Sequence, residues 1–95
     1  MSALDLSKNS PWFVYILRCA DGSLYTGITT DLDRRLAEHN GSELGARYTR
    51  GRRPVMLVYS EYLENRSLAS KKESLIKRLR KDQKESLISQ QAKMV

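Results

Sequence analysis

Two tyrosine-containing triplets stand out near the start of the sequence. They are Phe13-Val14-Tyr15 and Tyr25-Thr26-Gly27, and their tyrosines are ten residues apart. A phenol can give or take a proton, but its ordinary pKa lies near 10, so nearby cations must lower that pKa before it acts as a base at neutral pH. Each tyrosine taken alone is explained by cross-strand packing, because aromatic residues favour strands.

An arginine and the only histidine follow the second triplet at helical spacing. Arg35 and His39 are four residues apart, and Leu32 and Leu36 have the same periodicity. Residues four apart are neighbours on one side of a helix. We therefore expect the guanidinium and the imidazole to lie one turn apart. The alternative for His39 is a half-buried histidine that only packs beside Leu36.

Glu73 is the carboxylate whose position most needs an explanation. On a helical wheel it flanks an apolar stripe, near Ala69 and Ile76, so we expect it to be half-buried. A half-buried carboxylate needs a compensating partner, such as an arginine or a metal ion. The simpler alternative is a salt bridge to Lys77 or Arg80 on the same helix.

The charge of the chain favours a polyanionic partner. Lys and Arg number 17 against 11 Asp and Glu, which gives a net charge of +6 and a pI near 9.7. The excess is concentrated in residues 34–53 and 66–84. A basic domain of this kind attracts nucleic acid first and a membrane surface second.

Length and composition exclude several classes of protein. A chain of 95 residues forms one domain. The longest apolar run, residues 12–17, is too short to span a bilayer. Cys19 is the only cysteine, which rules out an internal disulfide and fits a reducing, cytoplasmic location. One cysteine and one histidine also exclude a structural zinc site of the usual kind.

A β-hairpin is predicted to carry both tyrosines. Residues 12–18 and 24–28 form its strands, and Asp21-Gly22 marks the turn. Side chains alternate faces along a strand, so a two-residue turn would place Tyr15 and Tyr25 on opposite faces. If both tyrosines serve one site, the loop must have odd length or contain a bulge, and the expected pairing is Tyr15 with Thr29.

The rest of the chain predicts an α+β domain of order ββαβαα, with a small antiparallel sheet of about three strands flanked by helices. The expected boundaries are a flexible tail at 1–10, a domain at 11–85, and the end of the last helix plus a tail at 86–95. After the hairpin we expect a helix at 32–40 capped by Asp31, a basic loop at 41–54, and a strand at 55–60 that is buried on both faces. A second helix is expected at 66–81, with an apolar stripe formed by Leu68, Leu75, Ile76 and Leu79. A short last helix is expected from the capping box Asp82-x-x-Glu85 to about Gln91.

Taken together, the two triplets and the three polar residues resemble the GIY-YIG nuclease family. The order Tyr15, Tyr25, Arg35, His39 and Glu73 matches the family over residues 12–84. The loop Gly45-Ala46-x-x-Thr49 followed by Arg53-Pro54 is similar to that of small, single-domain bacterial members. It is also similar to the nuclease domain of the eukaryotic branched-DNA endonuclease subunit. Many members carry an asparagine after the metal glutamate, and this chain has none after Glu73.

The resemblance implies hydrolysis of phosphodiester bonds with one divalent cation, Mg²⁺ or Mn²⁺. Arg35 would hold the phosphate, since a guanidinium presents parallel donors to it. Glu73 would be the protein ligand of the metal, because Mg²⁺ can bind through one carboxylate and keep its waters. Tyr15 or Tyr25 would be the base, assisted by His39. The expected nucleic-acid contacts are Arg47, Tyr48, Thr49, Arg50, Arg52, Arg53, Lys77 and Arg80.

Three functions remain open at this point. The first is a nuclease that selects nucleic acid by structure, with DNA favoured over RNA as its substrate. It would act in repair or recombination as a monomer, and a protein partner would supply targeting. The second is a binding module in which the basic loop grips phosphates without chemistry. The third is an interaction protein whose last basic helix docks on an acidic partner. Glu73 separates the first two, because a phosphate-binding module gains nothing from a carboxylate there.

Overall fold

A computed structural model describes residues 11–94, so the predicted tail at 1–10 lies outside the described residues. The strands are β1 (Trp12–Arg18), β2 (Leu24–Thr29) and β3 (Met56–Leu63), and the helices are α2 (Leu32–Gly41), α3 (Arg47–Arg50), α4 (Arg66–Lys77) and α5 (Lys81–Lys93). The predicted helix at 32–40 is confirmed, and the Asp31 carboxylate caps it by accepting from the Arg34 N–H at 3.0 Å. The basic loop differs from the prediction in containing the short helix α3.

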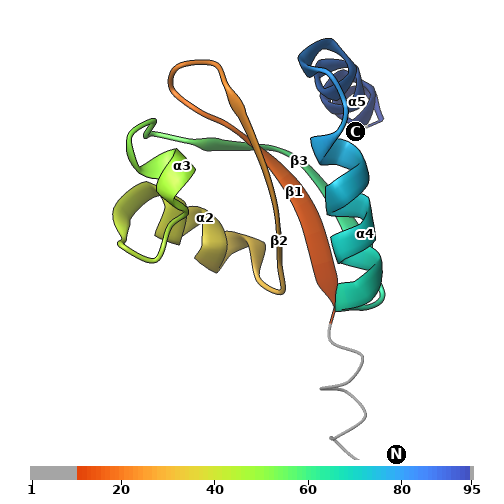
Figure 1. Ribbon diagram of the computed structural model, residues 1–95, viewed down its shortest axis with the longest axis horizontal. Coiled ribbons are helices and arrows are strands. Elements are labelled where there is room, and N and C mark those ends of the chain that lie inside the picture. Colours follow the sequence, from red (N-terminus) through yellow and green to blue (C-terminus); the bar gives the residue numbers. More distant parts are fainter. Residues whose placement is uncertain (1–10, 95) are drawn as a thin grey trace, which may run out of the picture.

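The three strands form one antiparallel sheet in the order β2-β1-β3. Figure 1 shows α2 and α3 on one side of this sheet and α4 and α5 on the other. The predicted α+β class and the order ββαβαα are confirmed, with α3 as an addition. Within residues 11–94, no helix combines the length and the apolar composition needed to cross a membrane.

Alternation along the central strand β1 divides the core in two. Val14 and Ile16 face α4 and α5, while Tyr15 and Leu17 face α2. All four side chains are at most 2% exposed. The first core is completed by the buried side chains of Tyr59, Ile76 and Ile88, and the second by those of Cys19 and Val55. Tyr15 therefore belongs to a packed layer, and its hydroxyl needs a partner inside the protein.

The hairpin has a three-residue loop, as the odd-length argument requires. The N–H of Cys19 donates to the carbonyl of Ser23 at 2.8 Å, and the N–H of Gly22 donates back to Cys19 at 2.9 Å. The loop thus consists of residues 20–22. Gly22 has a φ of +85°, a left-handed conformation that favours glycine.

This loop sets the register that brings the two tyrosines to one face. Tyr15 pairs with Gly27, and Leu17 pairs with Tyr25. The expected pairing of Tyr15 with Thr29 is therefore wrong by two residues. Because the shift is even, both tyrosines still point to the α2 side of the sheet, where their ring centroids are 6.4 Å apart.

Strand β3 is an edge strand, so the prediction of burial on both faces is wrong. Met56 and Leu57 are exposed, at 65% and 37%. The side-chain amide of Gln91 in α5 binds both the N–H and the carbonyl of Ser60, at 3.1 and 2.7 Å. Gln91 thereby covers part of the free edge, a common protection against strand pairing with other chains.

Helix α4 packs through only part of the predicted stripe: Ile76 is buried as predicted, whereas Leu68 and Leu75 are not. Its buried residues are Ala69 and Ile76, whereas Leu68 and Leu75 are 40% and 56% exposed. The small side chain of Ala69 lets the helix approach the sheet closely, which turns both leucines outward. The helix ends at Lys77 rather than 81.

Helix α5 begins differently from the predicted capping box. Arg80 is its N-cap, and the Gln83 side chain accepts from the Arg80 N–H at 2.9 Å. Glu85 instead pairs with Arg18 through two bonds of 2.7 Å, which fastens α5 to the sheet. The helix continues to Lys93, two residues past the predicted end, and Ile88 within it lies in the core.

Candidate active site

A chain of hydrogen bonds links β1 to the loop that follows α2. The Tyr15 hydroxyl lies 2.9 Å from Nε2 of His39, and Nδ1 of His39 lies 2.8 Å from Oγ1 of Thr49. Thr49 donates in turn to the carbonyl of Ala46 at 2.9 Å. His39 and Thr49 are both 0% exposed. Among residues 11–94, no buried side-chain nitrogen or oxygen lacks a partner, so this chain is fully satisfied.

The direction of the last bond fixes the others. Because the hydroxyl proton of Thr49 goes to Ala46, its oxygen accepts from Nδ1–H of His39. The Ala46 N–H also faces Nδ1, but at 3.4 Å it is too long to compete. Nε2 then carries the free lone pair and accepts the phenol proton of Tyr15. His39 is thus arranged to take a proton from Tyr15.

Burial sets the protonation states of this pair. Burial raises the pKa of Tyr15 to about 12, against a lowering by Arg35 and smaller increases from Tyr25 and Glu73. Burial, with Arg35 and Arg53 beside it, lowers the pKa of His39 to about 4. At neutral pH Tyr15 is a phenol and His39 is neutral. The expected lowering of the Tyr15 pKa by cations is therefore wrong for the site without substrate, because desolvation outweighs Arg35.

Tyr25 and Tyr48 extend the cluster toward the surface. The Tyr25 ring lies edge-on to His39 at 5.2 Å and is stacked with Tyr48 at 5.9 Å and 29°. The guanidinium carbon of Arg52 lies 4.0 Å from the centre of the Tyr48 ring. Tyr48 is 39% exposed. An aromatic path thus runs from the buried Tyr15–His39 pair to an exposed ring.

Arg35 lies beside the tyrosine pair and is held by its own helix and loop. Its Nη1 donates to Oε1 of Glu38 at 2.9 Å and to the carbonyl of Leu44 at 2.6 Å. Although burial opposes it, contacts with Glu38 and Tyr15 leave the pKa of Arg35 raised, so the guanidinium stays charged. Its remaining N–H groups can still bind an anion.

Glu73 approaches the cluster from the other side of the sheet. It lies on α4, which packs against β1 and β2, and β2 is an edge strand. Its side chain is 22% exposed, as the half-buried prediction required, and it lies 3.3 Å from Lys77. The Glu73 carboxylate is near enough to contribute to the raised pKa of Tyr15. The structure thus brings Tyr15, Tyr25, Arg35 and His39 together on the α2 side of the sheet, and it places Glu73 on α4, on the other side.

Comparison with known proteins identifies the family of this domain. The model of the GIY-YIG catalytic domain matches residues 11–86. The chain belongs to the GIY-YIG family. This is a family of nuclease domains, and the resemblance found in the sequence is confirmed.

Relatives of this GIY-YIG domain are small proteins of the same size class. UPF0213 protein DP2720 of Desulfotalea psychrophila is 62% identical over 77 residues, which cover 81% of this chain and 70% of that protein. UPF0213 protein YhbQ of Escherichia coli K12 is 46% identical over 83 residues, 87% of this chain and 82% of that one.

Solved structures confirm the fold. The solution NMR structure of UPF0213 protein BH0048 from Bacillus halodurans has a TM-score of 0.54 at 47% identity, covering 83% of each chain. The solution NMR structure of EF2693 from E. faecalis has a TM-score of 0.58 at 43% identity, covering 84% of each chain.

The glycine of the second GIY-YIG triplet has a steric role here. A Cβ on Gly27 would lie 2.6 Å from the Tyr15 hydroxyl oxygen and 2.8 Å from the ring carbon that bears it. Gly27 pairs directly with Tyr15 across the sheet. The phenol thus occupies the space that a side chain at position 27 would fill, and the missing side chain lets the hydroxyl reach His39.

Replacing that glycine tests this role. Gly27→Ala is expected to lower the free energy of unfolding by about 1–3 kcal/mol, because the buried Tyr15 ring must move and leave His39. Gly41→Ala is the control, since nothing lies within 4 Å of its Cβ and alanine favours the helix. Urea unfolding of both variants measures the difference, and equal stability would contradict the steric role.

Two residues predicted to contact nucleic acid have structural roles instead. Thr49 is fully buried and orients His39, so the prediction for it is wrong. The guanidinium of Arg53 binds the carbonyls of His39 and Ser42, both at 2.5 Å, and so fixes the loop to the end of α2. Proximity to other arginines in the sequence suggested phosphate binding for both. The feature of the sequence that could have identified the role of Thr49 is its hydroxyl group, which stands ten residues after His39.

The other predicted contacts remain at or near the surface. Arg47 and Arg50 are exposed on α3, and Lys77 and Arg80 are exposed at the end of α4 and just after it. Some of the N–H groups of Arg52 already have partners within the protein, because they donate to Asp21 at 3.1 Å and to the Tyr48 carbonyl at 2.8 Å. The exposed cations therefore flank the candidate site on both sides of the sheet.

The depressed pKa of His39 predicts an acid-sensitive fold. An imidazole with a pKa of about 4 when folded, against about 6.5 when free, binds its proton more tightly in the unfolded chain. Its contribution is complete above pH 6.5 and is lost as pH falls toward 4, by about 3 kcal/mol in order of magnitude. His39 is the only histidine, so this step is assignable.

Unfolding by urea at pH 7 and pH 4.5 measures this effect. The wild type is expected to lose more stability than His39→Gln over this interval, because the amide does not titrate. Parallel losses in the two proteins would show that His39 is not held neutral by the fold.

Proposed function

We propose that this protein is a metal-dependent nuclease that hydrolyses phosphodiester bonds in DNA. The observation that carries the proposal is the Tyr15–His39 hydrogen bond, in which the lone pair on Nε2 is directed at the phenol proton. Arg35 beside this pair and Glu73 across the sheet edge supply the cation and the carboxylate that phosphate chemistry needs.

Tyr15 and His39 would remove the proton of the attacking water together. As the water oxygen bonds to phosphorus, its proton passes to the Tyr15 oxygen and the phenol proton passes to Nε2 of His39. Tyr15 stays a neutral phenol throughout, so its pKa of about 12 is no obstacle. The bond from phosphorus to the leaving oxygen breaks, and that oxygen takes a proton from solvent. A bound anionic phosphate raises the proton affinity of His39.

Arg35 would bind the phosphate and stabilise its transition state. Its bonds to Glu38 and Leu44 orient the guanidinium on α2 and leave other N–H groups free. Charge grows on the phosphate oxygens as the water attacks, and preorganised donors stabilise that charge. The tie to Glu38 thus positions Arg35 before substrate arrives.

The residues present fit a metal bound through one carboxylate. Within residues 11–94 there is no group of three or more His, Cys, Asp or Glu side chains able to hold a metal ion. Mg²⁺ often binds through one or two carboxylates with water and substrate phosphate as its other ligands. Glu73 is half-buried, and an alternative partner, Lys77, lies 3.3 Å away. A bound Mg²⁺ or Mn²⁺ would neutralise charge on the phosphate and the leaving oxygen.

Recognition of DNA by this small domain would depend on structure rather than sequence. Exposed arginines and Tyr48 offer contacts to phosphates and a stacking surface for an unpaired base, and neither kind of contact reads a base sequence. We therefore favour branched or partly single-stranded DNA as substrate. The family resemblance is the basis for proposing a role in DNA repair or recombination, with a partner protein that supplies targeting, and the single cysteine is the basis for proposing a cytoplasmic location.

The second candidate is a binding module without catalysis. It is favoured by the Glu73–Lys77 salt bridge of 3.3 Å, which satisfies the carboxylate without a metal. In this function Arg35 and the exposed rim would hold phosphates, and the raised pKa of Tyr15 would keep it an inert phenol.

A cleavage assay on several nucleic acids separates the two candidates. The wild-type protein is incubated with end-labelled duplex, single-stranded, flap and branched DNA and with RNA, in Mg²⁺, Mn²⁺ or EDTA. The proposal expects cleavage of a branched or flap DNA with either metal and none in EDTA. Binding without cleavage under every condition would favour the binding module.

A further inference from the structure

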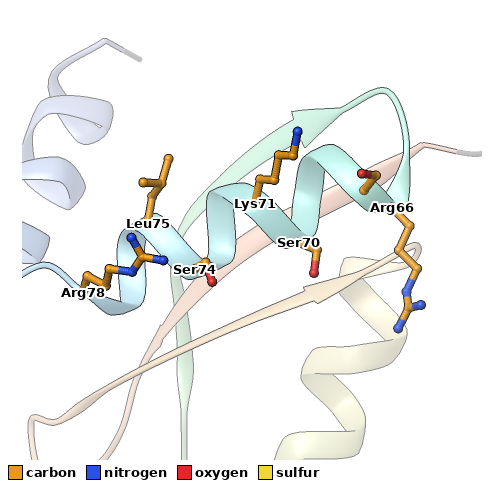
Figure 2. Close-up of a pocket in the computed structure, with 7 residues that line it drawn as sticks. Arg66, Ser70, Lys71, Ser74, Leu75 and Arg78 are labelled. Atoms are coloured by element: carbon orange, nitrogen blue, oxygen red, sulfur yellow. The ribbon is translucent and has the colours of Figure 1, made fainter.

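Helix α4 presents a second basic surface that faces away from the sheet. The side chains along its exposed side form a broad, open surface, and Figure 2 draws the residues that line it. Three cations and three hydroxyl groups account for nearly all of its lining. These residues are Arg66, Lys71, Arg78, Ser67, Ser70 and Ser74.

The spacing of these side chains produces an ordered row of donors. Ser67, Lys71, Ser74 and Arg78 follow one another at intervals of three or four residues, so each is about one turn, or 5.4 Å, from the next. In Figure 2 Arg66 and Arg78 lie toward the two ends of the helix, with Ser70, Lys71 and Ser74 between them. Hydroxyls and cations are the side-chain groups that most often bind phosphate oxygens.

The cations of this surface have no acidic partner in the described part of the chain. No salt bridge involves Arg66, Lys71 or Arg78 within residues 11–94. Glu73 is the only acid in α4, and it pairs with Lys77 instead. The positive charge of this face is therefore available to an external anion.

Its position connects this surface to the candidate active site. Glu73 and Lys77 are on the same helix, along the border between its buried and exposed sides. Helix α4 has twelve residues and is about 18 Å long, enough to contact several consecutive phosphates of one strand. A strand bound along this face would pass beside Glu73.

We propose that the exposed face of α4 binds the phosphate backbone of one nucleic-acid strand and guides it past Glu73. This inference rests on the proposed function and adds a binding surface to it. The contacts would be to phosphates, which carry no sequence information directly. They would contribute affinity and salt dependence, and no sequence preference.

The test compares two double variants with the same loss of charge. K71Q/R78Q removes two cations of the proposed surface, and K84Q/K93Q removes two from α5. Arg66 is left intact because its guanidinium lies over the Trp12 ring, at 5.6 Å. Binding to a fluorescently labelled branched DNA is measured by anisotropy in EDTA at 50–200 mM salt, so that cleavage plays no part.

The slope of log K against log salt decides the outcome. For K71Q/R78Q we expect a slope that is shallower by about 1.8, from about 0.9 for each lost phosphate contact, with weaker binding at low salt. For K84Q/K93Q we expect the wild-type slope. Equal changes in the two variants would overturn this inference while leaving the nuclease proposal intact. If wild-type protein binds no nucleic acid at all, both proposals fail.

Discussion

Glu73→Gln is expected to lower the single-turnover cleavage rate by on the order of 10³-fold, since a metal ion supplies several kcal/mol of charge stabilisation in phosphate chemistry. The amide has the same shape but loses the negative charge that would hold the cation. DNA binding measured in EDTA should be unchanged or slightly tighter, because a negative charge near the phosphate is removed. The substitution would therefore lower the rate without weakening DNA binding.

Glu61→Gln is the matched control for this change. Glu61 is also half-buried and near a lysine, at 3.6 Å from Lys72, but it lies on β3, at the opposite edge of the sheet from β2. Its partner Tyr59 donates to it at 2.7 Å, and an amide oxygen can still accept that bond. We expect a cleavage rate within about twofold of the wild type, as surface-like substitutions have small effects. Equal losses in the two variants would remove Glu73 from the site.

Tyr15→Phe is expected to lower the cleavage rate by about 10²–10⁴-fold, the usual contribution of a positioned proton-transfer group. Phenylalanine keeps the ring in its packed layer but has no oxygen to take the water's proton. The variant also leaves Nε2 of His39 without its donor, so a loss of about 1–3 kcal/mol in the free energy of unfolding should accompany the change.

Two other tyrosines separate catalysis from stability. Tyr59 lies in the other core, and its hydroxyl donates to Glu61. Tyr59→Phe removes that hydroxyl, so it should lower the free energy of unfolding with little effect on the cleavage rate. Tyr25→Phe tests the alternative base, because the Tyr25 ring also lies against His39. A larger rate loss for Tyr25→Phe than for Tyr15→Phe would assign the base to Tyr25 and contradict the proton path proposed here.

The hairpin illustrates what the sequence can predict. The two triplets and Asp21-Gly22 were sufficient to predict both strands, since strand propensity and turn chemistry are local properties. The odd loop followed only from the hypothesis that both tyrosines serve one site, because strand alternation then requires it. The exact pairing was missed because it depends on which loop residues take part in hydrogen bonds. The steric match between Gly27 and Tyr15 requires that register, so it too was beyond the sequence.

Residues that act through others were the hardest to assign. Thr49 lies among arginines in the sequence, and only the folded loop shows that it faces His39. Arg53 likewise holds backbone carbonyls that no local pattern identifies. Similarly, the outward turn of Leu75 follows from the close approach of Ala69 to the sheet, a tertiary effect that the helical periodicity does not contain.

The central claim is that residues from both sides of the sheet form one hydrolytic site at its edge. The most direct test is metal-dependent cleavage of one end-labelled branched DNA by the wild type, Y15F, E73Q and E61Q, purified and assayed in parallel with Mg²⁺ and with EDTA. We predict that the cleavage rates of Y15F and E73Q in Mg²⁺ fall close to the background rate seen in EDTA, while E61Q keeps the wild-type rate. Cleavage that persists equally in all four proteins, or a wild type that cleaves nothing with metal, would contradict the claim.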